Sequence, residues 1–244
     1  MHVRWVQSQY PKDVSESAND LLEFERPLLE RGEVVVGLDE VGRGALAGPL
    51  TVGAVVLTSV REPPKGLTDS KSLSARRRER LQGPLRDWCD EWSLGSVSPG
   101  EIDQWGLRVA LAVAATRALA GLQRRPTYAL VDGPFNFLGA GSTVIDESGP
   151  IPELCFTDLA CSALVGGDRR SATIAAASVL AKVARDEVMV NLHESSGLYG
   201  WSSNKGYGTP LHLEAILRHG PHAQHRRSWR LPEEGQVGLE TKIS

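Results

Sequence analysis

The stretch GEVVVGLDEVGRGALAGPLTVGAVVL, residues 32–57, decides the fold. It holds two apolar runs of strand length, Val34–Leu38 and Leu50–Leu57, on either side of a glycine-rich connection. Continuous β-branched runs of this kind are typical of strands that are buried on both faces. Because the connection is tight, we expect the two strands to be antiparallel neighbours. Asp39 and Glu40 then lie at the C-terminal end of the first strand.

Strand and helix patterns alternate through the rest of the chain. Residues 72–88, SLSARRRERLQGPLRDW, predict a helix that Gly83-Pro84 interrupts, because proline clashes with the preceding helical turn. Ser98-Pro99-Gly100-Glu101 is typical of a capping box and begins a long apolar helix to Gly121. Further strands are expected at 92–97, 128–131 and 163–165, and further helices at 174–194 and 209–220. The pattern predicts an α/β fold with a mixed sheet and a helical C-terminal part.

Composition limits the class of protein. The 244 residues are 41% hydrophobic and 23% charged, with a net charge of −3, as in ordinary globular domains. The three cysteines show no paired spacing, which argues against a disulfide framework or a thiolate zinc site. No segment reads as a signal peptide or a membrane span, so we expect a cytoplasmic protein without a membrane partner. We divide the chain into an N-terminal extension (1–32), a catalytic domain (33–197), a C-terminal helical substrate-binding region (198–232) and a tail (233–244).

Charge is unevenly distributed along the chain. Five basic residues and one acid lie between Lys71 and Arg80, and four histidines lie near Arg226 and Arg227. These segments predict two local basic patches, although a solvated helix face and a polar tail more often explain such runs. The overall charge alone therefore gives no support for a nucleic-acid partner.

Acidic residues follow three of the strand-like runs: Asp39 with Glu40, Asp132, and Asp168. Catalytic groups of open α/β sheets gather outside the carboxyl ends of strands, so these acids are expected to converge. Converging carboxylates repel one another and must be protonated or hold cations. Oxygen ligands of this kind favour Mg²⁺ or Mn²⁺. Two such ions would support phosphoryl chemistry, as in a nuclease or a phosphatase.

Other segments suggest contact with phosphate. Gly42-Arg43-Gly44 allows a close backbone approach, but its spacing fits no dinucleotide fingerprint. In the helix that begins near Ile174, a polar stripe of Ser178, Lys182 and Arg185 could face phosphate, or Lys182 could simply pair with Asp186 on the surface. Tyr207 lies in a glycine-rich loop, where it could stack on a base or pack the loop.

Five segments together resemble ribonuclease HII, in the same order and over residues 33–230. They are GLDEVGRGALAGPLTVGAVVL, LTDSKSLSARRRERL, LVDGPF, GGDRRSATIAAASVLAKVARDEVM and NKGYGTPLHLEAILRHGPHAQHRRSW. The resemblance implies a ribonuclease H-like fold with a five-stranded mixed sheet flanked by helices. It implies an endonuclease that cleaves the RNA strand of RNA/DNA hybrids and incises DNA at single embedded ribonucleotides. The implied metal ligands are Asp39, Glu40, Asp132 and Asp168, and the implied substrate-binding residues are Gly42, Arg43, Gly44, Asp69, Ser70, Lys71, Lys182 and Tyr207.

Several alternatives stay open. Because 36 positions separate Asp132 from Asp168, Asp158 and Asp186 are alternative fourth ligands. A related nuclease would cleave hybrids but ignore single ribonucleotides, and a non-catalytic hybrid-binding module would not cleave at all. A phosphatase is disfavoured by the basic loops, which suit an extended polyanion. We expect a monomer. The C-terminal residues 235–244 are a candidate docking tail for a sliding clamp and could equally be disordered.

Overall fold

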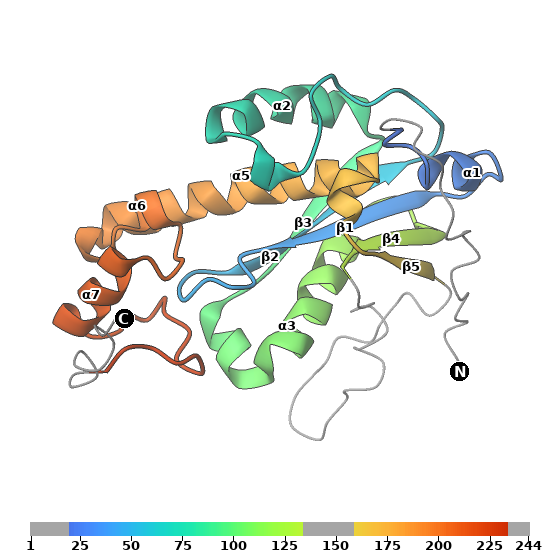
Figure 1. Ribbon diagram of the computed structural model, residues 1–244. Coiled ribbons are helices and arrows are strands. Elements are labelled where there is room, and N and C mark those ends of the chain that lie inside the picture. The colour runs from blue at the N-terminus through green and yellow to red at the C-terminus, as the bar shows by residue number, and fades with distance from the viewer. Residues whose placement is uncertain (1–19, 134–158, 234–244) are drawn as a thin grey trace, which may run out of the picture.

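The computed structural model describes residues 20–133 and 159–233, which form one five-stranded mixed sheet with helices on both faces (Figure 1). The strand order is β3-β2-β1-β4-β5. β1 pairs antiparallel with β2 and parallel with β4, which confirms the predicted hairpin and mixed sheet. The strands are β1 (Val35–Val41), β2 (Leu50–Leu57), β3 (Glu91–Val97), β4 (Tyr128–Asp132) and β5 (Ala160–Leu164). The last strand thus begins three residues before the predicted range of 163–165.

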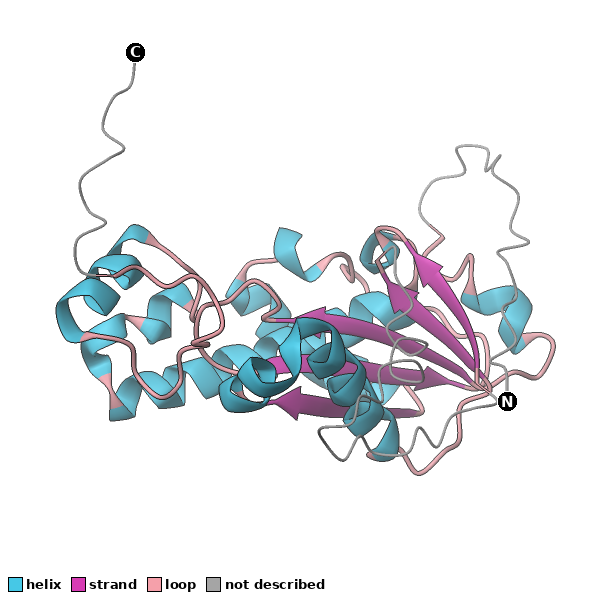
Figure 2. Cartoon of the chain, turned by 90° about the horizontal axis from the view of Figure 1, so that it is seen from below, coloured by secondary structure: helices cyan, strands magenta, loops and turns pink. Residues whose placement is uncertain are grey.

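Two long helices enclose the sheet. α5 (Ala172–Ser195) packs on one face against β1 and β2, and α3 (Pro99–Ala120) packs on the other against β2 and β3. Figure 2, seen from below, shows α3 crossing the near face of the twisted strands. α2 (Ala75–Trp88) lies on the outer side of α5. The short elements are α1 (Glu25–Leu29), α6 (Trp201–Asn204), α7 (Pro210–His219) and the 3₁₀ turns η1 (Ser70–Ser72), η2 (Gly167–Arg169) and η3 (Gly197–Tyr199).

The contact between α5 and the sheet depends on two glycines. A Cβ atom on Gly37 would lie 2.3 Å from the carbonyl carbon of Thr173, and one on Gly53 would lie 2.5 Å from the carbonyl oxygen of Ala177. Neither distance is possible without moving the helix away from the strands. Asp39 follows Gly37 on the same face of β1, so the close approach brings its side chain against α5.

One helix differs from its prediction. Gly83-Pro84 does not interrupt α2, which runs unbroken to Trp88. Both residues are exposed, so the helical hydrogen bond that proline cannot donate is missing on the solvent side. Leu85 and Trp88 anchor the end of the helix in the core. The capping box of α3 is confirmed, because Ser98 and Glu101 each bond the other's backbone N–H.

Part of the predicted N-terminal extension packs into the core. Leu22 and Leu28 are fully buried in the same apolar cluster as Val35 and the first turns of α5. The backbone N–H of Ala172 donates to the carbonyl oxygen of Leu21 at 2.6 Å. Residues 20–32 are therefore attached to the sheet and α5, whereas the proposed domain boundaries themselves stay a prediction.

The C-terminal region has a separate small core at the far end of α5 (Figure 1). Tyr199 stacks on Trp201 with ring centroids 5.0 Å apart. Trp201 Nε1 donates to His212 Nε2, which lies 3.0 Å from His225 Nε2. The predicted second basic patch is thus only partly confirmed. His212, His225 and Arg226 are buried, and burial lowers the pKa of both histidines, whereas His219, Arg227 and Arg230 are exposed.

No helix within the described ranges has the length and apolar character needed to cross a bilayer.

Candidate active site

Four acidic side chains meet where the strands β1 and β4 end and the turn η2 begins. Asp39 and Glu40 lie on β1, Asp132 is the last residue of β4, and Asp168 lies in η2, which is separated by two residues from the end of β5. Asp39 and Asp168 are each only 5% exposed. The parallel pairing of β1, β4 and β5 brings these ends together, as predicted from the sequence.

The acids act on one another electrostatically. Burial, together with the charges of Glu40, Asp132 and Asp168, raises the pKa of Asp39 to about 8 against an opposing hydrogen bond from Ser178. Burial also raises the pKa of Asp168, to about 6, with Asp132 and Asp69 as the next causes. Without cations, Asp39 therefore keeps a proton at neutral pH that a free carboxyl group would have lost.

Positive groups compensate part of this charge. Arg43 Nη1 lies 3.3 Å from Glu40 Oε1, and Lys71 Nζ lies 4.0 Å from Asp168 Oδ2. The backbone N–H of Gly167 donates to Asp132 Oδ1 at 2.7 Å, which fixes the β4 carboxylate beside η2. The Lys71 side chain is 80% exposed, so it can move toward a ligand at little cost.

The loop Asp69-Ser70-Lys71 reaches the acid cluster from α2. Ser70 Oγ lies 2.7 Å from Ser178 Oγ on α5, and Ser178 in turn bonds Asp39. Asp69 is buried, accepts the N–H of Lys71, and hydrogen-bonds Asp168. The resemblance implies that Asp69 lies beside the nucleic-acid backbone, whereas its observed contacts are with Lys71 and Asp168.

The loop Gly42-Arg43-Gly44 follows directly after the acids of β1. Its carbonyls point inward: the Arg226 guanidinium donates to the oxygens of Gly42 at 2.7 Å and Arg43 at 3.0 Å. Gly42 adopts φ +87°, and a Cβ atom there would lie 2.1 Å from Arg185 Nε. Arg43 and Gly44 are exposed next to the cluster.

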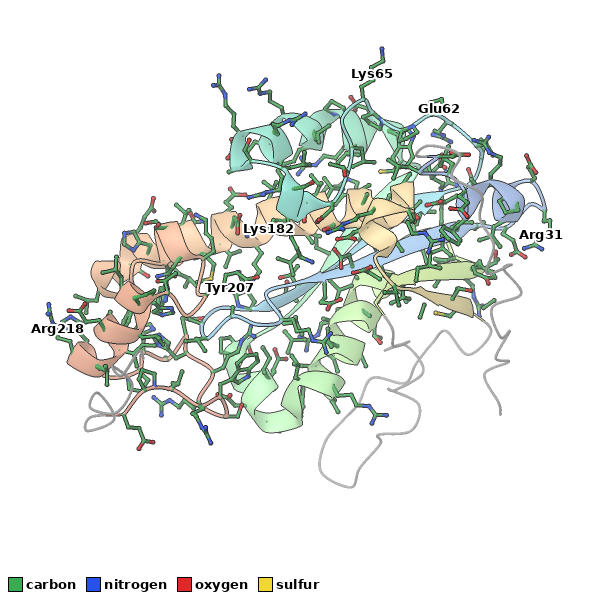
Figure 3. All side chains as sticks on the ribbon, in the orientation of Figure 1. Arg31, Glu62, Lys65, Lys182, Tyr207 and Arg218 are labelled. Atoms are coloured by element: carbon green, nitrogen blue, oxygen red, sulfur yellow. The ribbon has the colours of Figure 1, made fainter. Side chains whose placement is uncertain are left out.

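The predicted polar stripe on α5 is only partly open to a ligand. Arg185 is 1% exposed and donates to the carbonyl oxygens of Ala47, Pro49 and Lys205, so it cannot face phosphate. Lys182 remains near the surface, with Nζ 6.0 Å from the centre of the Tyr207 ring. Figure 3 shows Lys182 and Tyr207 side by side below α5, and Tyr207 is 37% exposed.

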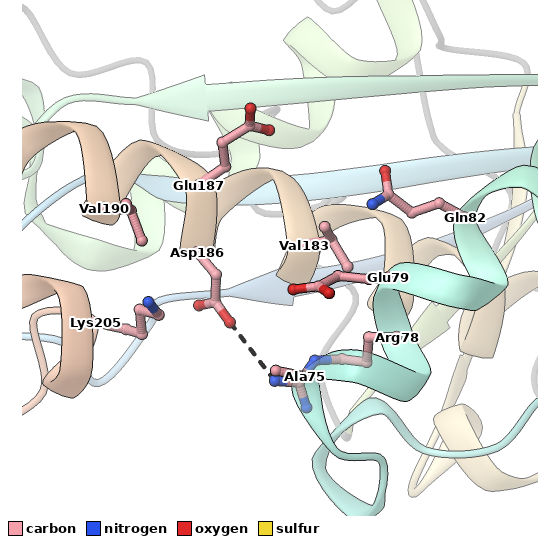
Figure 4. A pocket seen from close by; sticks show the side chains of 9 residues that line it. All are labelled: Ala75, Arg78, Glu79, Gln82, Val183, Asp186, Glu187, Val190 and Lys205. Carbon is pink, nitrogen blue, oxygen red and sulfur yellow. Dashed lines mark ion pairs between the residues drawn. The ribbon is translucent and has the colours of Figure 1, made fainter.

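A polar groove of about 400 Å³ separates α2 from α5 on the outer side of the molecule (Figure 4). Asp186 lines it, pairing with Lys182 and, at 3.6 Å, with Arg78. These two ion pairs, rather than contacts with the four acids, hold Asp186 in the groove. The other alternative ligand, Asp158, lies outside the described residues.

The donor set suits a hard divalent cation. Asp39, Glu40, Asp132 and Asp168 offer carboxylate oxygens, with no sulfur or imidazole among them. Across residues 20–133 and 159–233, no three His, Cys, Asp or Glu side chains already have the spacing of a complete metal site. The chemistry of the residues nevertheless fits Mg²⁺ or Mn²⁺.

The sheet order, the flanking helices and the acid cluster define a ribonuclease H-type nuclease. The match to a family model is specific: residues 36–231 match "Ribonuclease HII". The chain belongs to the ribonuclease HII family, whose members are endonucleases that hydrolyse RNA in RNA/DNA hybrids. The alternative of a non-catalytic binding module is therefore not supported.

Similar proteins agree with this assignment. The chain is 42% identical to a ribonuclease HII of Streptomyces coelicolor, over 81% of this chain and 77% of the relative. It is 45% identical to one of Cereibacter sphaeroides, over 89% and 93%. Among solved structures, ribonuclease H2 from Pyrococcus horikoshii matches with a TM-score of 0.63 and 26% identity, over 81% and 94%. The ribonuclease HII of an Archaeoglobus fulgidus PCNA complex matches with a TM-score of 0.63 and 27% identity, over 83% and 98%.

Sequence reasoning missed the residues that hold the site together. Ser178 was placed in a stripe facing phosphate, but it bonds Asp39 and Ser70. Arg226 was assigned to a surface patch, but it anchors the loop at Gly42. No periodic pattern marks either role, because both depend on contacts between segments that are distant in the chain.

Proposed function

We propose that this protein incises duplex DNA on the 5′ side of single embedded ribonucleotides, in addition to cleaving RNA/DNA hybrids. The products would carry a 3′-hydroxyl and a 5′-phosphate. The observation that supports this most directly is the glycine loop at residues 42–44, in which Arg43 and Gly44 are exposed beside Glu40 of the carboxylate cluster. A loop that would recognise one ribose thus adjoins the groups that would act on its phosphodiester.

Asp39, Glu40, Asp132 and Asp168 would hold two divalent ions. When bound, Mg²⁺ or Mn²⁺ ions supply activation of a water and stabilisation of the leaving oxygen. The protein's own part is to hold the carboxylates in place: Ser178 bonds Asp39, and the N–H of Gly167 bonds Asp132. No covalent enzyme intermediate is needed.

Recognition of RNA would come from the 2′-hydroxyl, which distinguishes the two sugars at a given site. Gly42, Arg43 and Gly44 would bind it through backbone groups. Tyr207 would stack on the neighbouring sugar or base, and its half-exposed ring beside Lys182 supports this. Lys71, Lys182 and the loop at Asp69 and Ser70 would lie near the backbone of the duplex.

Partner proteins are a separate proposal. The Archaeoglobus fulgidus relative is found in a complex with PCNA. We extend this to a sliding-clamp contact through residues 235–244, which lie outside the described residues. A monomeric state of the enzyme is our expectation. Size-exclusion chromatography with and without a clamp protein tests both statements.

The decisive experiment uses purified protein and duplex DNA that carries one ribonucleotide. Incision is followed on a denaturing gel with Mg²⁺, Mn²⁺ or a chelator. The test variant is Asp39→Asn, and the matched control is Asp87→Asn, which removes the same charge from an exposed position on α2. We expect metal-dependent cutting 5′ of the ribonucleotide by wild type and Asp87→Asn, and none by Asp39→Asn.

A second substrate separates the alternatives. Cutting of a long RNA/DNA hybrid without incision at the single ribonucleotide would favour the related nuclease. Incision that persists in chelator would contradict the metal-dependent mechanism. Full activity in Asp39→Asn would remove that residue from the site.

A further inference from the structure

The buried arginine of the C-terminal region, Arg226, has no role in the proposal above. Its side chain is 0% exposed, and its hydrogen bonds all go to backbone carbonyls. Nη1 donates to the oxygen of Arg43, Nη2 donates to those of Gly42 and Gly48, and Nε also donates to Gly48. Burying a guanidinium is costly unless all its donors are used, so this arginine fits the loop closely.

These bonds determine where the next amides of the loop point. In a planar trans peptide, the C=O of one residue and the N–H of the following residue point in opposite directions. Arg226 holds the carbonyls of Gly42 and Arg43 inward, so the N–H groups of Arg43 and Gly44 point outward. Neither N–H is bonded to any other residue in the described part of the chain. Both residues are exposed beside Glu40.

The loop needs such an anchor because glycines lie on both sides of Arg43. Glycine tolerates left-handed and right-handed backbone angles almost equally, so peptide groups next to it rotate at little cost. The bond from Ala45 N to Gly42 O, at 3.2 Å, closes the turn but leaves the carbonyl of Arg43 without a partner. Arg226 supplies that partner and holds the orientation of both peptide groups.

Two adjacent outward N–H groups match a hydroxyl oxygen, which can accept two hydrogen bonds. A deoxyribose offers no acceptor at that position. We propose that Arg226 is a positioning residue for ribose recognition, which keeps the N–H groups of Arg43 and Gly44 directed at the 2′-hydroxyl. The inference rests on the proposed function, and it makes the C-terminal region a determinant of the choice between RNA and DNA.

The test compares affinities for two duplexes of the same sequence, one with a single ribonucleotide and one entirely of DNA. Fluorescence anisotropy with labelled duplex, in Ca²⁺ to prevent cutting, measures both dissociation constants. The ratio of the two constants reports ribose recognition alone. A residue that only stabilised the fold would change the active fraction or both affinities, but not this ratio.

In Arg226→Gln, we expect the preference for the ribonucleotide duplex to fall about tenfold, as for the loss of two modest hydrogen bonds. The affinity for the DNA duplex should change little. Arg226→Lys, which keeps the charge but has fewer fixed donors, should retain part of the preference. The matched control is Arg227→Gln, which removes the same charge from an exposed neighbour and should leave the ratio unchanged.

A second variant tests the amide directly and leaves Arg226 in place. Gly44→Pro deletes the N–H of residue 44, at a position where an added Cβ meets no atom within 4 Å. It should lower the ratio even if Arg226→Gln fails to fold. An unchanged ratio in either folded variant overturns the inference. If wild-type protein binds both duplexes equally well, the proposed function itself is contradicted, and the inference about Arg226 is contradicted too.

Discussion

Asp39→Asn should abolish cutting and yet stabilise the metal-free protein. Asp39 is 5% exposed, and burial together with its acidic neighbours raises its pKa from 3.8 to about 8. The unfolded chain ionises this carboxyl above pH 3.8, whereas the folded protein keeps it protonated up to about pH 8. The folded state therefore binds more protons in this window, and its stability falls as the pH rises.

The size of the effect follows from the same values. Each pH unit between the two pKa values costs about 1.4 kcal/mol, so at pH 7 the penalty from Asp39 reaches about 4 kcal/mol. An asparagine has no such penalty, and its amide oxygen still accepts the hydrogen bond of Ser178. We expect the variant to be about 2–4 kcal/mol more stable than wild type at pH 7 in chelator.

Urea unfolding followed by tryptophan fluorescence, in chelator at pH 5, 6, 7 and 8, measures this difference. The gap between variant and wild type should widen with pH, and added Mg²⁺ should narrow it by stabilising wild type alone. Asp87→Asn, at an exposed position, should unfold like wild type throughout. A variant that is less stable than wild type at pH 7, or a gap that is constant with pH, would refute the reasoning.

Three further predictions concern other parts of the molecule. Glu25→Ala should cost about 3 kcal/mol of stability, because the buried Glu25 Oε1 accepts hydrogen bonds from Ser171 and Thr173, which would lose their partner. Thermal unfolding measures the loss, and the control Glu30→Ala, at an exposed position, should cost almost nothing. Burial lowers the pKa of His225 from 6.5 to about 4, so the folded state resists protonation. Stability should fall by up to about 3 kcal/mol as the pH drops from 6.5 to 4. The fall should be smaller in His225→Gln, and an equal fall in that variant would disprove the prediction. Tyr207→Ala should weaken duplex binding about tenfold by anisotropy and Tyr207→Phe should not, whereas equal losses would show that the hydroxyl is what matters.

Much of the fold follows from local patterns. The hairpin of β1 and β2 was predicted from two apolar runs and a short connection, and its antiparallel pairing confirms it. The start of α3 was predicted from its capping box. The break at Gly83-Pro84 was a wrong prediction, because a local rule cannot weigh the anchoring of Trp88 in the core against one lost hydrogen bond.

The candidate site, like the fold, could be predicted from the sequence only in part. The rule that acids follow strands predicts that Asp39, Glu40, Asp132 and Asp168 converge, since the ends of parallel strands share one edge of the sheet. The roles of Asp69 and Arg185 were not predictable in this way. Asp69 hydrogen-bonds Asp168, and Arg185 binds backbone carbonyls in the interior. Both sets of contacts depend on how separate segments pack.

The sequence by itself determined the order of strands and helices, the chemistry of the acid cluster and the family, since residue type and spacing along the chain encode each of these. Tertiary structure alone decided which polar residues are buried and which groups they hydrogen-bond. Residues 20–32 join the core through Leu22 and Leu28, and Arg226 reaches the loop at Gly42 across 184 positions. Burial and hydrogen bonding depend on distances in space between segments, and no local pattern along the chain contains those distances.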